Sequence, residues 1–145
     1  MYLLDTNIVS MLDVRRHVHA PALAEWLQRN GARLFLSVMT ITELDAGVLK
    51  LRRERKAKRA DEIAVLVSEI VADFGQRVLP IDLETARQVA RLGGAALRPP
   101  VALPDLIIAA TAVRHDLIVL TRNVSQISRL DVPALDPFAE LPPEA

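Results

Sequence analysis

Residues 2–7 read YLLDTN, a short apolar run that ends in a carboxylate, a hydroxyl and an amide. The apolar residues are typical of a buried strand, and Asp5 follows them directly. Asp, Thr and Asn all suit turns and helix N-termini, so turn chemistry is one explanation of this polar end. The other explanation is that Asp5 belongs to a binding site, and only the rest of the chain can separate the two.

Three further apolar runs resemble the one that precedes Asp5. They are residues 34–38 (LFLSV), 77–81 (RVLPI) and 117–121 (LIVLT). Each run is nearly continuous rather than alternating, which is typical of strands that are covered on both faces. Helical segments separate the runs, and strands that alternate with helices predict an α/β fold with a central, mainly parallel sheet.

The spacing of apolar residues predicts the helices that flank this sheet. The expected helices cover residues 20–29, 40–59, 61–74, 83–97 and 104–115. The last of these is apolar nearly all round, so we expect it near the centre of the molecule. We predict a single domain over residues 1–133, followed by a short acidic, Pro-rich surface tail over residues 134–145.

The composition is that of an ordinary globular protein, with about half of the 145 residues hydrophobic, a quarter charged and a net charge of zero. The chain has no cysteine, which excludes disulfides and thiolate zinc sites. No apolar stretch is long enough to span a bilayer, and no signal peptide is visible. We therefore expect a cytoplasmic protein with no membrane partner.

Polar residues with metal-binding chemistry follow the predicted strands. Asp5 ends the first strand, and Glu43 follows the second at the start of a helix. Asp105 lies in the first turn of the apolar helix, and Asn123 follows the fourth strand. The carboxyl ends of parallel strands meet at one edge of a sheet, where open α/β folds bind their ligands. We therefore expect these four side chains to converge on one cleft.

Each acid also has a purely structural explanation. Residues 40–43 (TITE) match a capping box that ends in Glu43, and Asp105 after Pro104 suits the positive end of a helix dipole. Asp5 or Thr6 suits the cap of the next helix. Three carboxylates at one sheet edge nevertheless repel one another unless protons or a cation neutralise them, so the joint pattern favours a metal site.

The chemistry of such a site is bounded by its ligands. Carboxylates without His or Cys suit hard cations, which means Mg²⁺ or Mn²⁺. These ions activate an attacking water and stabilise the charge that develops on a phosphate group. Phosphodiester hydrolysis is the reaction class that this pattern indicates.

Four segments, in this order, resemble PIN-domain ribonucleases, specifically the toxin component of VapBC-type toxin–antitoxin systems. The segments are YLLDTNIVS, SVMTITELDAGV, LPDLIIAATAV and LIVLTRN. The resemblance covers essentially the whole chain and implies a PIN-like three-layer fold with a central sheet of about five strands flanked by helices. It also implies Mg²⁺- or Mn²⁺-dependent cleavage of RNA by a metal-activated water.

The resemblance further implies roles for individual residues and partners. Asp5, Glu43 and Asp105 correspond to the catalytic carboxylates and metal ligands, and Thr6 to a supporting hydroxyl. A small VapB-type antitoxin is expected to occupy the active-site groove, and the protein is expected to form a homodimer or a hetero-oligomer with that antitoxin. Many relatives carry another acid at or just after the position of Asn123. Here Asn123 offers only an amide oxygen as a ligand or support, so we expect one tightly held ion and a second that arrives with the substrate.

Basic residues concentrate in residues 50–59 (KLRRERKAKR), with seven basic groups against one Glu. If this segment is helical, four of them form one stripe on its surface. These are Arg52, Arg55, Lys56 and Arg59. The stripe is either a solvated face or a surface that contacts RNA phosphates, and Arg122 beside the cleft is a further candidate for phosphate contact or for packing. With only five aromatic residues in the chain, we expect backbone charge and RNA shape, rather than base stacking, to govern recognition.

Two other classes of protein fit part of this pattern. A catalytically weakened PIN-like module that binds RNA or a partner is suggested by the missing fourth acid. A receiver-type phospho-acceptor domain also gathers acids at strand ends. It requires an acceptor Asp after its central strand and a suitably placed lysine, whereas all three lysines here lie within residues 50–58.

Overall fold

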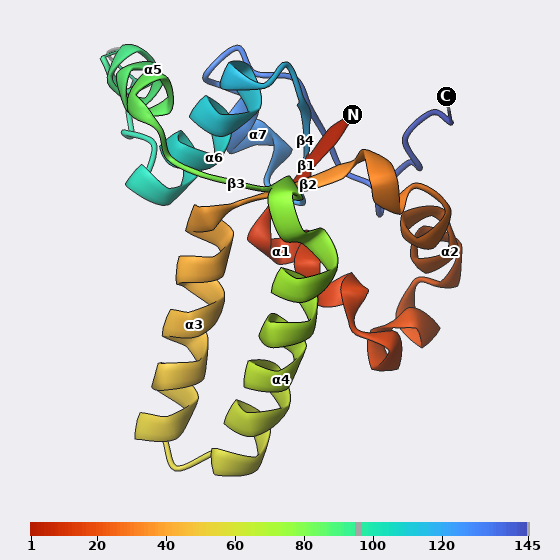
Figure 1. Cartoon of the computed structure of the whole chain (residues 1–145). Coiled ribbons are helices and arrows are strands. Elements are labelled where there is room, and N and C mark those ends of the chain that lie inside the picture. Colours follow the sequence, from red (N-terminus) through yellow and green to blue (C-terminus); the bar gives the residue numbers. More distant parts are fainter. Residues whose placement is uncertain (95–96, 145) are drawn as a thin grey trace.

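The computed structural model describes residues 1–94 and 97–144, which contain one sheet of five parallel strands (Figure 1). The strands are β1 (Tyr2–Leu4), β2 (Leu34–Ser37), β3 (Val78–Leu79), β4 (Ile118–Leu120) and β5 (Ala134–Leu135). Their order in the sheet is β3-β2-β1-β4-β5, and each neighbouring pair is parallel. The predicted α/β fold with a parallel sheet of about five strands is confirmed.

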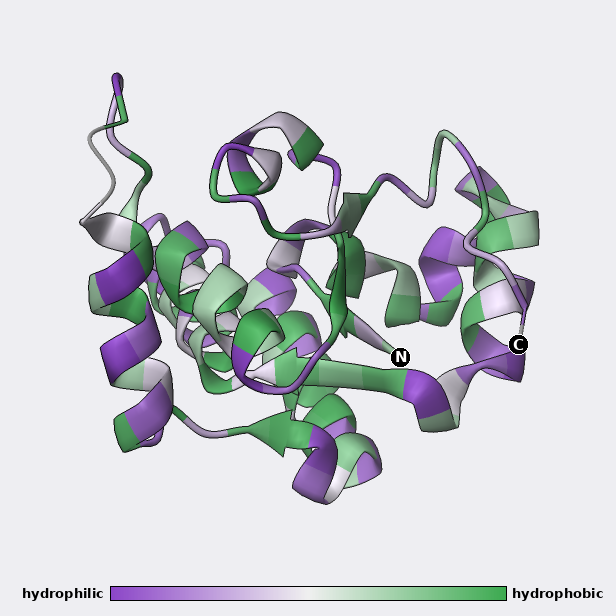
Figure 2. Cartoon of the chain, turned by 90° about the horizontal axis from the view of Figure 1, so that it is seen from above, coloured by the Kyte–Doolittle hydropathy of each residue, from purple (hydrophilic) through white to green (hydrophobic). Residues whose placement is uncertain are grey.

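Helices cover both faces of this sheet. The α-helices are α1 (Thr6–Val9), α2 (Pro21–Arg29), α3 (Val38–Arg53), α4 (Ala57–Phe74), α5 (Leu83–Gly93), α6 (Leu103–Arg114) and α7 (Val124–Ser128). Short 3₁₀ segments join them, namely η1 (Ser10–Leu12), η2 (Val14–His19), η3 (Gly31–Arg33) and η4 (Gly75–Arg77). In Figure 2 the strands form a predominantly hydrophobic layer with helices on either side.

The alternation of side chains along β1 divides the core in two. Leu4 points to one face of the sheet, where it packs with Trp26 of α2 and Ile70 of α4. Leu3 points to the opposite face, where its cluster includes Ile108 of α6. Both leucines are fully buried, so β1 is covered from both sides, as its continuous apolar sequence predicts.

Helix α6 is the central helix that its apolar sequence predicts. It packs against α3, α5, α7 and the strands of the sheet. Its buried face consists of Ile108, Ala109, Ala110, Thr111 and Ala112. Among the residues that the structure describes, no helix is both long enough and apolar enough to cross a membrane.

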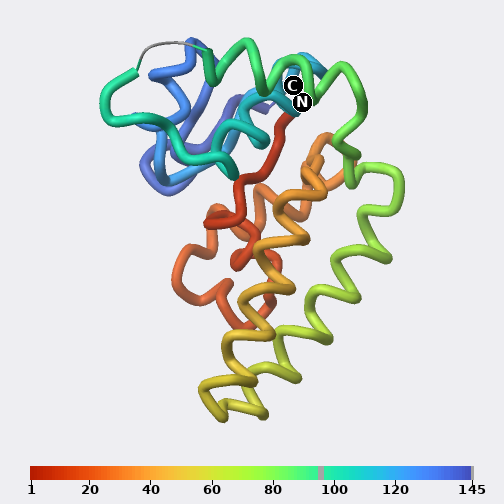
Figure 3. The backbone as a smooth tube through the Cα atoms, turned by 90° about the vertical axis from the view of Figure 1, so that its left-hand side faces the viewer, coloured from red at the N-terminus to blue at the C-terminus, as the bar shows by residue number. Residues whose placement is uncertain are grey.

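The predicted continuous helix over residues 40–59 is wrong. Helix α3 ends at Arg53, the chain reverses, and α4 begins at Ala57, so that the two helices project from the sheet as an arm (Figures 1 and 3). Arg55 at the reversal has a left-handed backbone (φ 59°). The reversal buries Val48 of α3 and Ala60 of α4 against the arm's interior, whereas one long helix would leave both faces in water.

Two predicted boundaries also differ in the structure. Helix α5 ends at Gly93 rather than residue 97, and residues 95 and 96 lie outside the described part. The tail expected from residue 134 begins with β5, which pairs with β4, so this boundary falls inside the sheet. The segment after β5 runs back across the domain. Near its end, the carbonyl oxygen of Pro143 accepts a hydrogen bond from the Tyr2 hydroxyl (3.1 Å). Ala134 and Leu135 pair with β4, which would otherwise be an open edge of the sheet, and they therefore belong to the fold and not to a surface tail.

Candidate functional site

Asp5 lies directly after β1, at the carboxyl edge of the sheet, and its side chain is buried with 5% exposure. Its Oδ1 accepts from the backbone N–H of Thr6 (2.7 Å). Its Oδ2 accepts from the hydroxyl of Thr121 (2.6 Å) and from Nδ2 of Asn7 (3.3 Å). A carboxylate offers about four acceptor positions, so these three donors fix its orientation and leave one position for a ligand. Asp5 is therefore both the cap of α1 and the centre of a polar site.

Thr121 and Asn7 are site residues that the sequence prediction missed. Thr121 directly follows β4 and is fully buried. Besides donating to Asp5, its hydroxyl accepts from the backbone N–H of Asn123 (2.9 Å). Asn7 accepts at Oδ1 from the backbone N–H of Arg122 (3.1 Å). The sequence did carry a signal for Thr121, because it ends an apolar strand as Asp5 does.

Glu43 lies in the second turn of α3, not in a capping box. The cap of α3 is Ser37, whose hydroxyl accepts from the N–H of Met39 (3.1 Å), so that Thr40 is already inside the helix. Oε1 of Glu43 accepts from the hydroxyl of Thr6 (2.7 Å), which also lies 3.3 Å from Oγ1 of Thr40. Thr6 therefore ties Glu43 to the chain segment that carries Asp5, and the capping explanation of Glu43 no longer holds.

Asp105 occupies the first turn of α6 and is half-buried. Burial raises the pKa of its carboxyl, and the negative charge of Asp5 raises that pKa further. The two aspartates are thus close enough to repel each other, although a hundred residues separate them in the chain. The position of Asp105 also agrees with the helix-dipole explanation, so a structural role and a metal-binding role are compatible at this residue.

The carboxylates of Asp5, Asp105 and Glu43 have the chemistry to bind a hard cation, but the three do not form one compact cluster. In residues 1–94 and 97–144, no three acidic or histidine side chains lie together as a ready-made metal cluster. Asp5 and Asp105 act on each other directly, whereas Glu43 reaches them through Thr6. All of these donors are oxygens, which is the chemistry of Mg²⁺ and Mn²⁺ sites rather than of zinc sites.

Asn123 joins the site through its backbone. The backbone N–H of Asn123 donates to the hydroxyl of Thr121. Asn123 itself is exposed, and its side chain forms no capping hydrogen bond with α7. Arg122 is also exposed, and its guanidinium lies 4.8 Å from the ring centre of Phe138. Thr121, rather than Asn123, supplies the polar side chain at the end of β4.

The predicted stripe of basic residues along one helix is wrong, because the arm turns back between α3 and α4. Arg52 lies near the end of α3, Arg55 and Lys56 lie in the turn, and Arg59 lies in α4. Three of these cations are already paired with acids. Their partners are Asp61 for Arg52 (2.9 Å), Glu54 for Lys56 (3.2 Å) and Glu62 for Arg59 (3.3 Å). The segment is a partly neutralised surface rather than a continuous cationic stripe.

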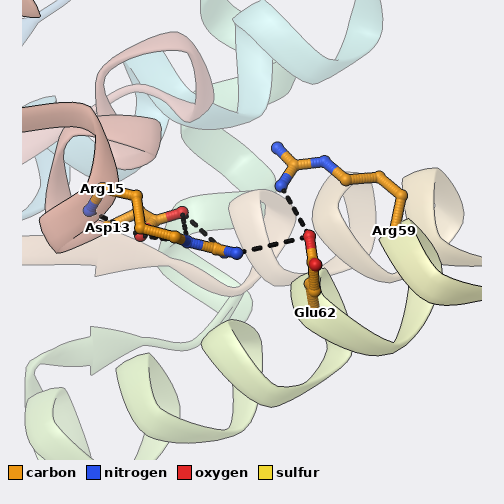
Figure 4. Close-up of polar contacts among 4 residues, drawn as sticks. All are labelled: Asp13, Arg15, Arg59 and Glu62. Atoms are coloured by element: carbon orange, nitrogen blue, oxygen red, sulfur yellow. Dashed lines mark hydrogen bonds and ion pairs between the residues drawn. The ribbon is translucent and has the colours of Figure 1, made fainter.

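An ion-pair network joins the first turns of α4, near the tip of this arm, to η2 (Figure 4). Arg15 contacts Asp13 (2.9 Å) and Glu62 (3.3 Å), and Glu62 also contacts Arg59. The hydrogen bonds from Arg15 hold the pKa of the Asp13 carboxyl below its ordinary value. Because Asp13 caps η2, the network anchors the segment that leads into α2.

Comparison with known proteins places this geometry in a family. Residues 2–132 match the PIN domain. The chain is 32% identical over 141 residues to Toxin FitB of Neisseria gonorrhoeae, covering 95% of this chain and 99% of that protein. It is 31% identical over 143 residues to VapC ribonuclease Y4jK of Sinorhizobium fredii, covering 95% of this chain and 98% of that protein. The crystal structure of FitAcB from Neisseria gonorrhoeae has a TM-score of 0.77 and 30% identity, covering 95% of this chain and 99% of that chain.

Proposed function

The chain belongs to the PIN-domain family, as its sequence resemblance predicts, and we propose that it is a metal-dependent endoribonuclease, the toxin of a VapBC-type pair. The observation that carries this proposal is the carboxylate of Asp5, which three donors orient at the sheet edge while its charge raises the pKa of Asp105. The similarity to VapC ribonuclease Y4jK supports the choice of RNA as the substrate, and the similarity to Toxin FitB supports the role of a toxin.

The mechanism assigns a distinct task to each polar residue. Asp5 and Asp105 would hold Mg²⁺ or Mn²⁺, with Glu43 at longer range. When bound, such an ion lowers the pKa of an attacking water and neutralises charge on the phosphate. Thr121 and Asn7 hold Asp5 in one orientation, so that no reorganisation is needed when the substrate arrives.

Glu43 is suited to handle the proton of the attacking water. Its Oε1 is engaged by the hydroxyl of Thr6, which leaves Oε2 to accept a proton or to hold the water in place. Asn123 contributes by orienting Thr121 through its backbone N–H. A second ion is expected only together with the substrate, because the chain supplies no acid at that position.

A small VapB-type antitoxin is the proposed protein partner, and the similarity to Toxin FitB supports it. An antitoxin that covers the carboxylate edge would exclude RNA from Asp5 and Asp105. We further propose that the free toxin is a homodimer, as the resemblance to VapBC toxins implies. Size-exclusion chromatography with light scattering measures the mass of the toxin alone, and a monomer at micromolar concentration contradicts the homodimer.

Cleavage of an RNA pool by the purified protein tests the enzymatic proposal. Activity should require Mg²⁺ or Mn²⁺, should stop with a chelator, and should fall at least 100-fold in Asp5→Asn and Glu43→Gln. Asp45→Asn is the matched control, because Asp45 is an exposed acid two residues from Glu43 on the same helix. The proposal fails if the wild type does not cleave with either ion, or if Asp5→Asn cleaves as fast as the wild type.

The second candidate function is an RNA- or partner-binding module without catalysis. It is favoured by one observation, namely that the described residues hold no ready-made group of three acids. Binding of RNA by the wild type without cleavage, unchanged in Asp5→Asn, identifies this alternative.

A further inference from the structure

The segment after β5 forms one wall of a cavity of about 370 Å³. Residues 137–141 line it on one side, and residues 19–23, where η2 meets α2, line it on the other. This volume is within the range of ligand pockets, on the order of 300–1,000 Å³. The ion-pair network of Asp13 and Arg15 anchors the start of η2, the segment that leads to this second wall (Figure 4).

A short series of contacts connects this cavity to the carboxylate site. Phe138 lines the cavity, and the guanidinium of Arg122 lies 4.8 Å from the centre of its ring. Arg122 directly follows Thr121, the residue that donates to Asp5, and its own backbone N–H donates to Asn7. Arg122, which contacts the aromatic ring, is therefore held through its backbone by the residues that orient Asp5.

The charge of Arg122 is available to a ligand. No carboxylate of the described residues forms an ion pair with it, whereas Arg52 and Arg59 of the arm are each paired with an acid. Its contact with Phe138 leaves both side chains accessible, since Phe138 is 38% exposed. A guanidinium stacked on a ring keeps its outward N–H groups free to bind phosphate.

We propose that this cavity binds one nucleotide of the RNA next to the scissile phosphate, with its phosphate at Arg122 and its base stacked on Phe138. This inference rests on the proposed ribonuclease function. His19 and Glu140, which also line the cavity, supply polar groups that can contact the edge of the base. Stacking on an aromatic ring combined with contacts to base edges is how proteins recognise unpaired RNA.

The scarcity of aromatic residues had argued against base stacking as a means of recognition. The structure nevertheless places one of the five aromatic rings, that of Phe138, against Arg122, for which the described residues show no ion pair. One ring is sufficient for one base. Recognition of a single base adjacent to the cleavage point is the specificity that this arrangement predicts.

The test measures the affinity of a labelled, unpaired RNA oligonucleotide by fluorescence anisotropy in the presence of a chelator, so that no cleavage occurs. Phe138→Ala and Phe138→Leu should both weaken binding, by about 5- to 100-fold, because each removes the stacking ring. Leu83→Ala is the control, since Leu83 is an exposed apolar residue at the start of α5. Thermal unfolding of each variant verifies that the exposed position tolerates the change.

Abasic substitutions in the oligonucleotide identify the stacked base. One abasic position should weaken wild-type binding as much as Phe138→Ala does, and the two changes together should weaken it no further. The proposal is overturned if the two effects multiply at every position. It is also overturned if Phe138→Leu binds RNA like the wild type, because that result shows that no base stacks on the ring.

The failure of the nucleotide site can be distinguished from the failure of the proposed ribonuclease function. A wild type that binds RNA but never cleaves it contradicts the ribonuclease, while the anisotropy experiment still decides whether a base stacks on Phe138. Conversely, a wild type that cleaves RNA and is unaffected by Phe138→Leu retains the ribonuclease and loses the nucleotide site.

Discussion

Replacing Thr121 with valine removes one hydroxyl from the site while keeping the shape of the side chain. The hydroxyl donates to Oδ2 of Asp5 (2.6 Å) and accepts from the backbone N–H of Asn123 (2.9 Å) and from Nδ2 of Asn7 (3.3 Å). Thr121 is fully buried, so no water can replace the lost donor without disturbing the packing of β4. Thr121→Val therefore isolates the support that orients Asp5.

The loss of stability depends on which of these three hydrogen bonds has no substitute partner in the variant. A hydrogen bond to a charged group contributes about 1.5–3 kcal/mol. The N–H of the exposed Asn123 can turn to water, and Asn7 keeps its contact with Asp5, so these two losses are small. We expect a total loss of about 2 kcal/mol in the free energy of unfolding, which lowers the Tm by about 6 °C for a chain of this size. Misplacement of the carboxylate should lower kcat/KM for RNA on the order of 10- to 100-fold.

Urea unfolding and RNA cleavage measure the two effects, and Thr111→Val is the matched control. Thr111 is equally buried, but its hydroxyl donates to the carbonyl oxygen of Ile107 within α6, an oxygen that the helix already uses. This control should lose less than about 1 kcal/mol and cleave RNA normally. If Thr121→Val unfolds at the same urea concentration as Thr111→Val and cleaves RNA like the wild type, Thr121 does not support Asp5.

Three further predictions concern charge. Asp105→Asn should raise the Tm at pH 7 in the absence of metal. Burial raises the pKa of Asp105, so its ionised form destabilises the fold at this pH. The difference in Tm between variant and wild type should vanish below the ordinary pKa of aspartate, where Asp105 is protonated in both the folded and the unfolded state. Asp82→Ala should lower the Tm at pH 7 without affecting cleavage, since hydrogen bonds from Thr85 hold the pKa of this helix-capping carboxyl low. In thermal unfolding measured against pH, the difference in Tm between variant and wild type should disappear as the pH falls through that lowered pKa. Arg122→Gln should reduce the salt dependence of RNA affinity by a slope of about 0.7, whereas Lys56→Gln, whose ammonium is already ion-paired, should change it less.

Local sequence signals were sufficient for most of the fold. The apolar run of β1 and the central helix α6 are both predicted by residues within a few positions of each element. The start of α3 was not, because both Ser37 and Thr40 are good cap residues. Ser37 was selected by pairing with Leu79 of β3, a contact that no local pattern encodes.

The reversal between α3 and α4 illustrates a second limit. No glycine, proline or asparagine marks residues 54–56, and Arg55 adopts a left-handed backbone that its residue type does not favour. The turn exists because it lets α3 and α4 bury apolar residues against each other, which is a property of the pair. The same limit applies to the site, where Asp5 was predictable as an acid at the end of a strand and the side chains that donate to it, Thr121 and Asn7, were not.

The bond between Thr121 and Asp5 spans 116 residues of the chain, and this has a consequence for biosynthesis. A protein emerges from the ribosome N-terminus first, so Asp5 leaves it long before β4 is available to lie beside β1. Until residue 121 has been synthesised and docked, the carboxylate of Asp5 lacks the shortest of its hydrogen bonds. The orientation of Asp5 is therefore a property of the nearly complete chain, and the proposed nuclease centre stays unassembled for most of its own translation.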